Sequence, residues 1–137
     1  MSVITVADAD GFLKEKLAPC VQDLGITFEN IGDGSITLRV PPSERLNRMG
    51  GIVCGQAIMA VADTAMVFAV ASAAGGFVPM TTVNQTTSFL RPAADADLIA
   101  EARIVKRGKT LMYGEVNLHT GTPEKLIAHV TSTYMLL

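Results

Sequence analysis

The stretch CGQAIMAVADTAMVFAVASAA, residues 54–74, carries one charged side chain, Asp63, in an otherwise uncharged and largely apolar run. A helix that is apolar on all sides is typical of a protein core, so we expect a buried helix over residues 54–74. The Gly75-Gly76 pair that follows is a typical helix end. Because a carboxylate is costly to bury without hydrogen-bond donors, Asp63 is either a paired structural group or a reacting one.

The same run is long enough, at about 20 residues, to be considered as a membrane span. Asp63 lies near its centre, where a charge costs roughly 2.5–3.5 kcal/mol on insertion scales. The run is rich in Ala rather than Leu, and aromatic or basic anchors do not flank both of its ends. A core helix is therefore favoured, and we expect no membrane partner. Residues 1–10 show no basic segment followed by an apolar one, so we predict no signal peptide and a cytoplasmic location.

The composition is typical of one globular domain spanning residues 1–137. Of these residues, 49% are hydrophobic and 18% are charged, which excludes a disordered chain. Lys and Arg number 11 and Asp and Glu 13, and the resulting net charge of −2 argues against nucleic acid as a partner. Cys20 and Cys54 are far apart in sequence, which favours neither a zinc site nor a disulfide framework. No metal site is expected.

Alternation of apolar and polar side chains predicts strands on both sides of the central helix. The clearest strand covers residues 35–40, and the turn Gly32-Asp33-Gly34 before it predicts a hairpin with a strand over residues 24–31. A short amphipathic helix at about residues 8–18 precedes this hairpin, with Asp8 or Asp10 as its cap. The strands expected after the central helix cover residues 82–90, 98–104, 110–119 and 125–135.

The order of these elements is helix, two strands, helix, four strands. Segregated helices and consecutive hairpins favour an α+β fold with an antiparallel sheet rather than a doubly wound parallel sheet. One long helix can be buried on all sides by about six strands only if the sheet curls around it. In the first strand after the helix, Thr82, Asn84, Thr86 and Ser88 are expected on one face, which is hydrated or forms an interface for most of its length.

Three segments of the chain resemble one family. They are residues 51–56 followed by Ala62-Asp63-Thr64-Ala65, the strand and turn of residues 83–93, and the basic hairpin of residues 105–111. In this order they resemble the hotdog-fold acyl-CoA thioesterases of the 4HBT superfamily, nearest to the PaaI-like, phenylacetate-degradation branch. That branch has a His-Gly-Gly triplet with an Asp seven residues after its second Gly. Here the triplet falls on Cys54-Gly55-Gln56, and the Asp on Asp63.

The resemblance implies a hotdog fold, with a long central helix wrapped by a curved antiparallel sheet of about six strands. It also implies a homodimer with one continuous sheet, often paired again into a homotetramer, and a site at the dimer interface. Asp63 would act as nucleophile or as general base for water. The backbone N–H of Gly55 would polarise the thioester carbonyl, as helix N-termini are suited to do. Thr82 falls where the family often has a hydroxyl that positions water or the acid.

The substrate implied is an acyl-CoA thioester, with coenzyme A as part of the substrate and no separate cofactor. The acyl group is expected along an apolar tunnel beside the helix, where Ala57 and Ala60 leave room. Cations suit phosphate oxygens, so the basic turns either hold the phosphates of coenzyme A or carry only solvated charge. The residues predicted to bind substrate are Phe89, Leu90, Arg91, Pro92, Lys106, Arg107, Gly108 and Lys109.

Two departures from the family pattern lie in the triplet itself. Cys54 replaces the family's His and is either a nucleophile or a small buried residue. Gln56 replaces the second Gly and is either a further oxyanion donor, through its amide, or a residue of the dimer interface. His119 and His129 fall on late strands and are expected to be strand residues rather than ligands.

Three other functions stay open. A non-catalytic acyl-CoA or fatty-acyl binding protein on the same fold is supported by the departures at Cys54 and Gln56. A hotdog hydratase or dehydratase would need a His paired with an acid near the central helix, and residues 43–90 contain no His. A purely structural oligomer would show no affinity for acyl-CoA.

Overall fold

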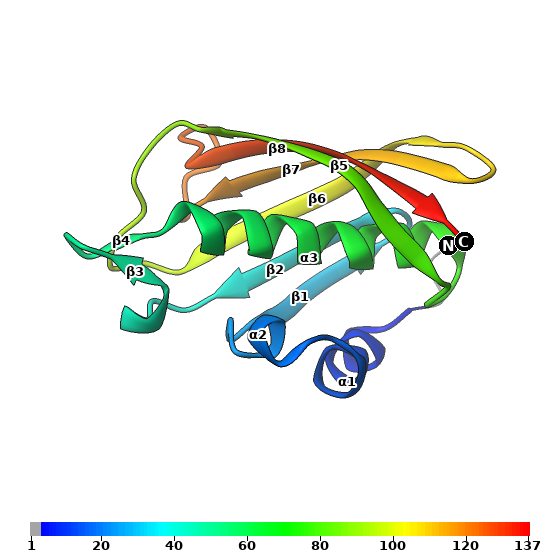
Figure 1. Ribbon diagram of the computed structural model, residues 1–137, viewed down its shortest axis with the longest axis horizontal. Coiled ribbons are helices and arrows are strands. Elements are labelled where there is room, and N and C mark those ends of the chain that lie inside the picture. The colour runs from blue at the N-terminus through cyan, green and yellow to red at the C-terminus, as the bar shows by residue number, and fades with distance from the viewer. Residues whose placement is uncertain (1–3) are drawn as a thin grey trace.

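A six-stranded antiparallel sheet wraps around one long helix in the computed structural model, which describes residues 4–137 (Figure 1). The long helix, α3 (Gly55–Ala74), lies on the concave face of the sheet, and two short helices lie beside one edge. This arrangement confirms the predicted α+β fold. The helices and the single 3-10 turn described are α1 (Val6–Lys16), α2 (Pro19–Gln22), η1 (Glu44–Leu46) and α3. The strands are β1 (Thr27–Gly32), β2 (Ser35–Val40), β3 (Asn47–Arg48), β4 (Ile52–Val53), β5 (Met80–Phe89), β6 (Leu98–Arg107), β7 (Leu111–His119) and β8 (Ala128–Leu136).

The strand order in the large sheet is β1-β2-β6-β7-β8-β5, and every neighbouring pair is antiparallel. The expected hairpin of β1 and β2 is present, with Gly32 opposite Ser35. Helices α1 and α2 lie against the β1 side of the sheet, whereas β5 forms the opposite edge. That second edge pairs with no other strand in the described part of the chain.

The predicted core helix begins one residue later than expected and ends where the glycine pair predicts. Gly75 takes the left-handed conformation, with φ of 82°, and its N–H bonds the carbonyl of Ala71. The helix is long and apolar enough to cross a membrane, but 67% of its most apolar window is buried inside the fold. It is therefore the core helix. It approaches the sheet closely, because a Cβ on Gly114 would lie only 2.8 Å from Met66 Cε.

The N-terminal helix differs from its prediction at both ends. Thr5 caps α1 by accepting from the N–H of Asp8, whose side chain accepts from the N–H of Thr5 in return. Asp8 is therefore the partner of the cap, and neither Asp8 nor Asp10 is the cap itself. The helix ends at Lys16, where Leu17 becomes extended with ψ of 157°, and Pro19 keeps Ala18 extended as well, with ψ of 147°. Pro19 then begins α2, which was not predicted.

Two other differences concern short segments. The predicted loop of residues 43–53 contains the small ribbon of β3 and β4, which turns through Gly50 and Gly51 at φ of 95° and 73°. The last strand begins at Ala128, three residues later than predicted. Residues before it belong to a connection in which the carbonyl of Ile127 accepts from the N–H groups of Leu90 and Arg91.

Candidate active site

Two hydroxyl groups bind one oxygen of the Asp63 carboxylate. Thr82 Oγ1 donates to Asp63 Oδ1 at 3.0 Å, and the Tyr134 hydroxyl makes a short hydrogen bond to the same oxygen. The Tyr134 hydroxyl also lies 3.0 Å from the main-chain oxygen of Asp63. Among residues 4–137, nothing hydrogen-bonds the second carboxylate oxygen, Oδ2. The side chain is thus fixed at one oxygen and available at the other.

Register and a β-bulge place the two hydroxyls together. Thr82 on β5 is paired directly with Tyr134 on β8, and both side chains point toward the helix. A register shift between Thr82 and Asn84 follows immediately, so that Val83 is an extra residue in β5. A bulge of this kind re-aims the side chains that follow it.

The bulge corrects the predicted face of β5. Gln85 donates to the carbonyl of Met59 on α3 at 3.1 Å, and Phe89 packs against Gly55 at the start of α3. Odd-numbered residues after the bulge therefore face the helix, as Thr82 does before it. Thr82 consequently does not share a face with Asn84, contrary to the strict alternation assumed from sequence.

Tyr134 is a candidate site residue that the sequence did not reveal. Only 2% of its surface is exposed. Burial, together with the hydrogen bond to Asp63, raises the pKa of the Tyr134 hydroxyl. The hydroxyl therefore stays protonated in neutral solution and acts as a donor to the carboxylate. Its inward alternation on the last strand was visible, but its proximity to Asp63 depends on a pairing between residues 71 positions apart.

The first turn of α3 leaves two backbone N–H groups available. Cys54 is the N-cap: its Sγ accepts from the N–H of Ala57 at 3.4 Å, and its carbonyl accepts from Ile58. The N–H groups of Gly55 and Gln56 have no acceptor within the described residues. Free amides at the positive end of a helix can stabilise a developing oxyanion. The side chain of Gln56 is exposed.

Asp63 and Gly55 do not meet within one subunit. They are separated by two turns of α3, about 12 Å along the helix axis at 1.5 Å per residue. Asp63, Thr82 and Tyr134 line a cavity of about 420 Å³. Gly55 lines a different cleft, of about 490 Å³, together with four of the predicted substrate-binding residues: Phe89, Leu90, Arg91 and Pro92.

The basic turns lie at opposite ends of the sheet (Figure 1). Arg91 follows β5 at the end where α3 begins, and its Nη1 donates to the carbonyl of Leu126 at 2.9 Å. Residues 106–109 form the tip of the β6–β7 hairpin at the other end. There Arg107 pairs with Asp33 at 2.9 Å, and this hydrogen bond lowers the pKa of Asp33. Lys106 and Lys109 are exposed and form no ion pair with any residue in 4–137.

The histidines have partners in the sheet. His119 Nε2 lies 2.8 Å from Glu101 Oε1, and its Nδ1 accepts from the N–H of Gly121. His129 Nδ1 lies 2.7 Å from the amide oxygen of Asn117. In the described part of the chain, no group of three or more His, Cys, Asp or Glu side chains is placed to hold a metal ion.

The known proteins similar to this chain are described as esterases or thioesterases. A family model described as the thioesterase superfamily matches residues 50–127. A presumed esterase of Thermoplasma acidophilum is 36% identical over 114 residues, covering 78% of this chain and 74% of its own. A presumed esterase of Thermoplasma volcanium is 33% identical over 132 residues, covering 93% and 88%. The crystal structure of a presumed thioesterase from Silicibacter sp. TM1040 matches with a TM-score of 0.87 at 29% identity, covering 100% of this chain and 94% of that one.

Proposed function

The chain belongs to the thioesterase superfamily, and from that membership and the geometry of Asp63 we propose that it hydrolyses acyl-CoA thioesters to a carboxylic acid and coenzyme A. Its fold is the hotdog fold of solved thioesterases. The observation that carries the proposal is the Asp63 carboxylate, with Oδ1 bound by two hydroxyls and Oδ2 available beside a cavity. The finer placement in the PaaI-like branch stays a prediction.

A dimer formed through β5 would complete the site. This strand has ten residues, is largely exposed, and its outer edge has no partner strand within the described chain. Such an edge is suited to pair with another copy. Antiparallel pairing of two β5 strands would bring the Thr82 end of one strand toward the Phe89 end of the other. Asp63 would then approach Gly55 of the partner subunit, which removes the 12 Å separation found within one subunit, about two helical turns.

The proposed reaction uses these groups in sequence. The N–H groups of Gly55 and Gln56 bind the carbonyl oxygen of the thioester and stabilise its negative charge in the transition state. Asp63 Oδ2 either takes a proton from a water that attacks the carbonyl carbon, or attacks that carbon itself to form an anhydride that water then hydrolyses. The carbon–sulfur bond breaks, and the thiolate of coenzyme A leaves. Neither route requires a cofactor.

The departures in the triplet are compatible with turnover. Cys54 occupies the N-cap position without occupying the amides of Gly55 and Gln56. The donor pair that an oxyanion needs is therefore retained in spite of the missing His. This favours catalysis over the alternative of a protein that only binds acyl-CoA. A catalytic Cys54 is less well supported, because no His lies near it in sequence to take its proton.

The proposed function is tested by thiol release from short, medium, long and aromatic acyl-CoA esters. We expect steady release from at least one class of ester. Binding of these esters without release would instead support the binding protein, and neither binding nor release would leave a structural oligomer. The number of subunits, dimer or homotetramer, and the cytoplasmic location stay predictions.

Tyr134→Phe is expected to lower kcat by about 10- to 100-fold and to change KM little. Without this donor, Asp63 is bound by Thr82 alone and can turn away from the attacking geometry. A displacement of about 1 Å from that geometry lowers the rate by up to about 100-fold. Steady-state kinetics on the preferred ester measure the effect. Thr82→Val removes the other donor and should give a similar loss. A Tyr134→Phe enzyme with altered KM and normal kcat would contradict the positioning role.

Arg91→Ala is expected to raise KM for acyl-CoA roughly 10-fold, the effect of losing one charge-assisted hydrogen bond to phosphate. The kcat should change less, because the contact is the same in the ground and transition states. A pantetheine thioester, which lacks the nucleotide, should be hydrolysed equally by both enzymes. Lys14→Ala, on the surface of α1, is the matched control for loss of a positive charge. Equal changes with both esters would exclude a phosphate contact.

A further inference from the structure

The cavity beside Asp63 ends at a pair of stacked aromatic rings. Its walls away from the carboxylate are apolar and include Leu17, Val67 and Met80. Phe12 from α1 and Phe77 from the loop after α3 close it on one side. Their ring centroids are 4.1 Å apart and the planes differ by 5°. We call these two residues the Phe12–Phe77 pair.

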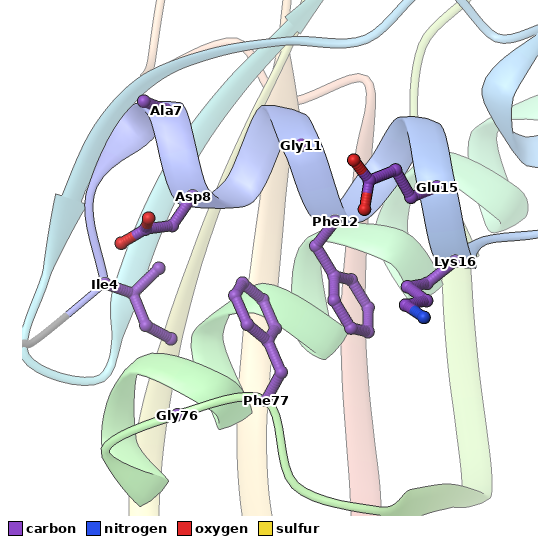
Figure 2. A pocket seen from close by; sticks show the side chains of 9 residues that line it. All are labelled: Ile4, Ala7, Asp8, Gly11, Phe12, Glu15, Lys16, Gly76 and Phe77. Atoms are coloured by element: carbon purple, nitrogen blue, oxygen red, sulfur yellow. The ribbon is translucent and has the colours of Figure 1, made fainter.

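The same pair takes part in the lining of a second cavity. It has a volume of about 480 Å³, runs between α1 and the start of the loop after α3, and is also lined by Phe12 and Phe77. Figure 2 shows the two rings side by side, Phe12 projecting from α1 and Phe77 rising from the loop below it. Ile4, Ala7 and Gly11 line the space beyond them. The pair therefore forms a wall that the two cavities share, which we call the partition, and only one of the cavities contains Asp63.

The partition is of a kind that a ligand or a substitution can open. Both rings are half-buried rather than buried, so neither is fixed on all sides. Phe77 follows Gly75 and Gly76 in the connection to β5, and it has no hydrogen-bonded strand partner. Phe68 contacts both rings edge-on, at 6.1 Å and 6.0 Å, and is itself buried. The cluster thus has one fixed ring and two rings at a cavity wall.

The charge and polarity of the side chains that line the two cavities determine which acyl chain can enter them. The inner cavity offers apolar side chains beyond the reacting carboxylate. The outer one carries the charges of Asp8, Glu15 and Lys16, two carboxylates and one ammonium. Two of these three charges are negative, so a tail ending in a carboxylate would be repelled on balance, whereas a methyl end carries no charge to be repelled. The apolar lining of the inner cavity favours an uncharged acyl chain.

We propose that the Phe12–Phe77 pair is the end of the acyl-binding cavity and limits the length of the acyl chain. This inference rests on the proposed function, since it takes the cavity beside Asp63 as the acyl site. Short and medium linear chains end at the pair. Longer chains reach the outer cavity only when the rings part, so removing one ring joins the two cavities and extends the range of substrates.

Kinetics on two esters test this limit. The measured quantity is the ratio of kcat/KM for palmitoyl-CoA to that for hexanoyl-CoA. Phe77→Ala is expected to raise this ratio at least about tenfold, because the additional methylene groups of the longer chain gain apolar contacts. Phe77→Trp, which enlarges the partition, should lower it. Phe28→Leu is the matched control: its ring packs on Phe68, at 4.6 Å between centroids, and lines neither cavity, so the ratio should stay unchanged even if stability falls.

A second variant fills the outer cavity. Gly11 lines it, and a Cβ there would meet nothing within 4 Å, so a larger side chain is accommodated. Adding Gly11→Leu to Phe77→Ala should reverse the gain for palmitoyl-CoA. An unchanged ratio in Phe77→Ala, with normal wild-type turnover, would overturn the length limit and leave the proposed function intact. If the wild-type protein releases thiol from neither of these esters nor from any other ester of the panel, the proposed function fails. Calorimetry then tests the limit alone, by measuring the dissociation constants of the same two esters for the wild-type protein and for Phe77→Ala. If the ratio of the two constants is the same in both proteins, the length limit is overturned.

Discussion

Asp63→Asn is expected to lower kcat by about 10²–10⁴-fold, the range that a general base contributes. The amide cannot take a proton from water or attack a carbonyl carbon. Its oxygen can still accept from Thr82 and Tyr134, which now bind Oδ1 of the carboxylate. The fold should therefore be retained, and the loss should lie in the chemical step. Steady-state thiol release and thermal unfolding, measured on the same preparation, separate these two effects.

The matched control for Asp63→Asn is Asp97→Asn. Asp97 is a carboxylate immediately before β6, paired with Arg39 at 3.0 Å and outside both the Asp63 cavity and the Gly55 cleft. This variant should keep its kcat. A kcat for Asp63→Asn within a few-fold of the wild-type value would exclude Asp63 as base and as nucleophile.

Gly55→Pro is expected to lower kcat by about 10²–10³-fold, the usual loss for one oxyanion donor. Proline removes the N–H group but is tolerated at the first position of a helix. The residue before it must be extended, and Cys54 already is, with φ of −70° and ψ of 152°. The helix should therefore form as before. Kinetics with the preferred ester, together with circular dichroism, check both expectations.

Gly55→Ala separates the donor from the added carbon. Its Cβ would lie 3.3 Å from the ring of Phe89, a close contact that a proline at this position shares. Alanine keeps the N–H group, so its loss of kcat should be much smaller. Equal losses in the two variants would show that crowding against Phe89, and not the N–H group, explains the effect.

The helix and the fold class could be predicted from the sequence because local signals determine them. The run of residues 54–74 is apolar on all sides, and Gly75 can take the left-handed conformation that ends a helix. A helix that must be buried on all sides, in a chain with six predicted strands, is compatible with few architectures. The prediction of which side chains share a strand face assumed an unbroken period of two. That period is interrupted at Val83, where the bulge inserts one residue.

The composition of the candidate site depended on contacts between distant residues. Asp63 stood out as the only charge in its run, and Thr82 entered through the resemblance to a family. Tyr134 could not be found in this way, because its hydroxyl reaches Asp63 only through the pairing of β5 with β8. The basic turns show the same limit: Arg91 and the residue 106–109 hairpin lie at opposite ends of one subunit.

The central claim is that Asp63 of one subunit acts with Gly55 of the partner subunit. Co-expression of Asp63→Asn and Gly55→Pro chains with different affinity tags allows mixed dimers to be purified and their thiol release measured. If the site is shared, each mixed dimer has one site with both groups intact and one with both altered. It should then show about half of the wild-type kcat, since a two-fold dimer holds two equivalent sites. A mixed dimer no more active than either parent would contradict the shared site.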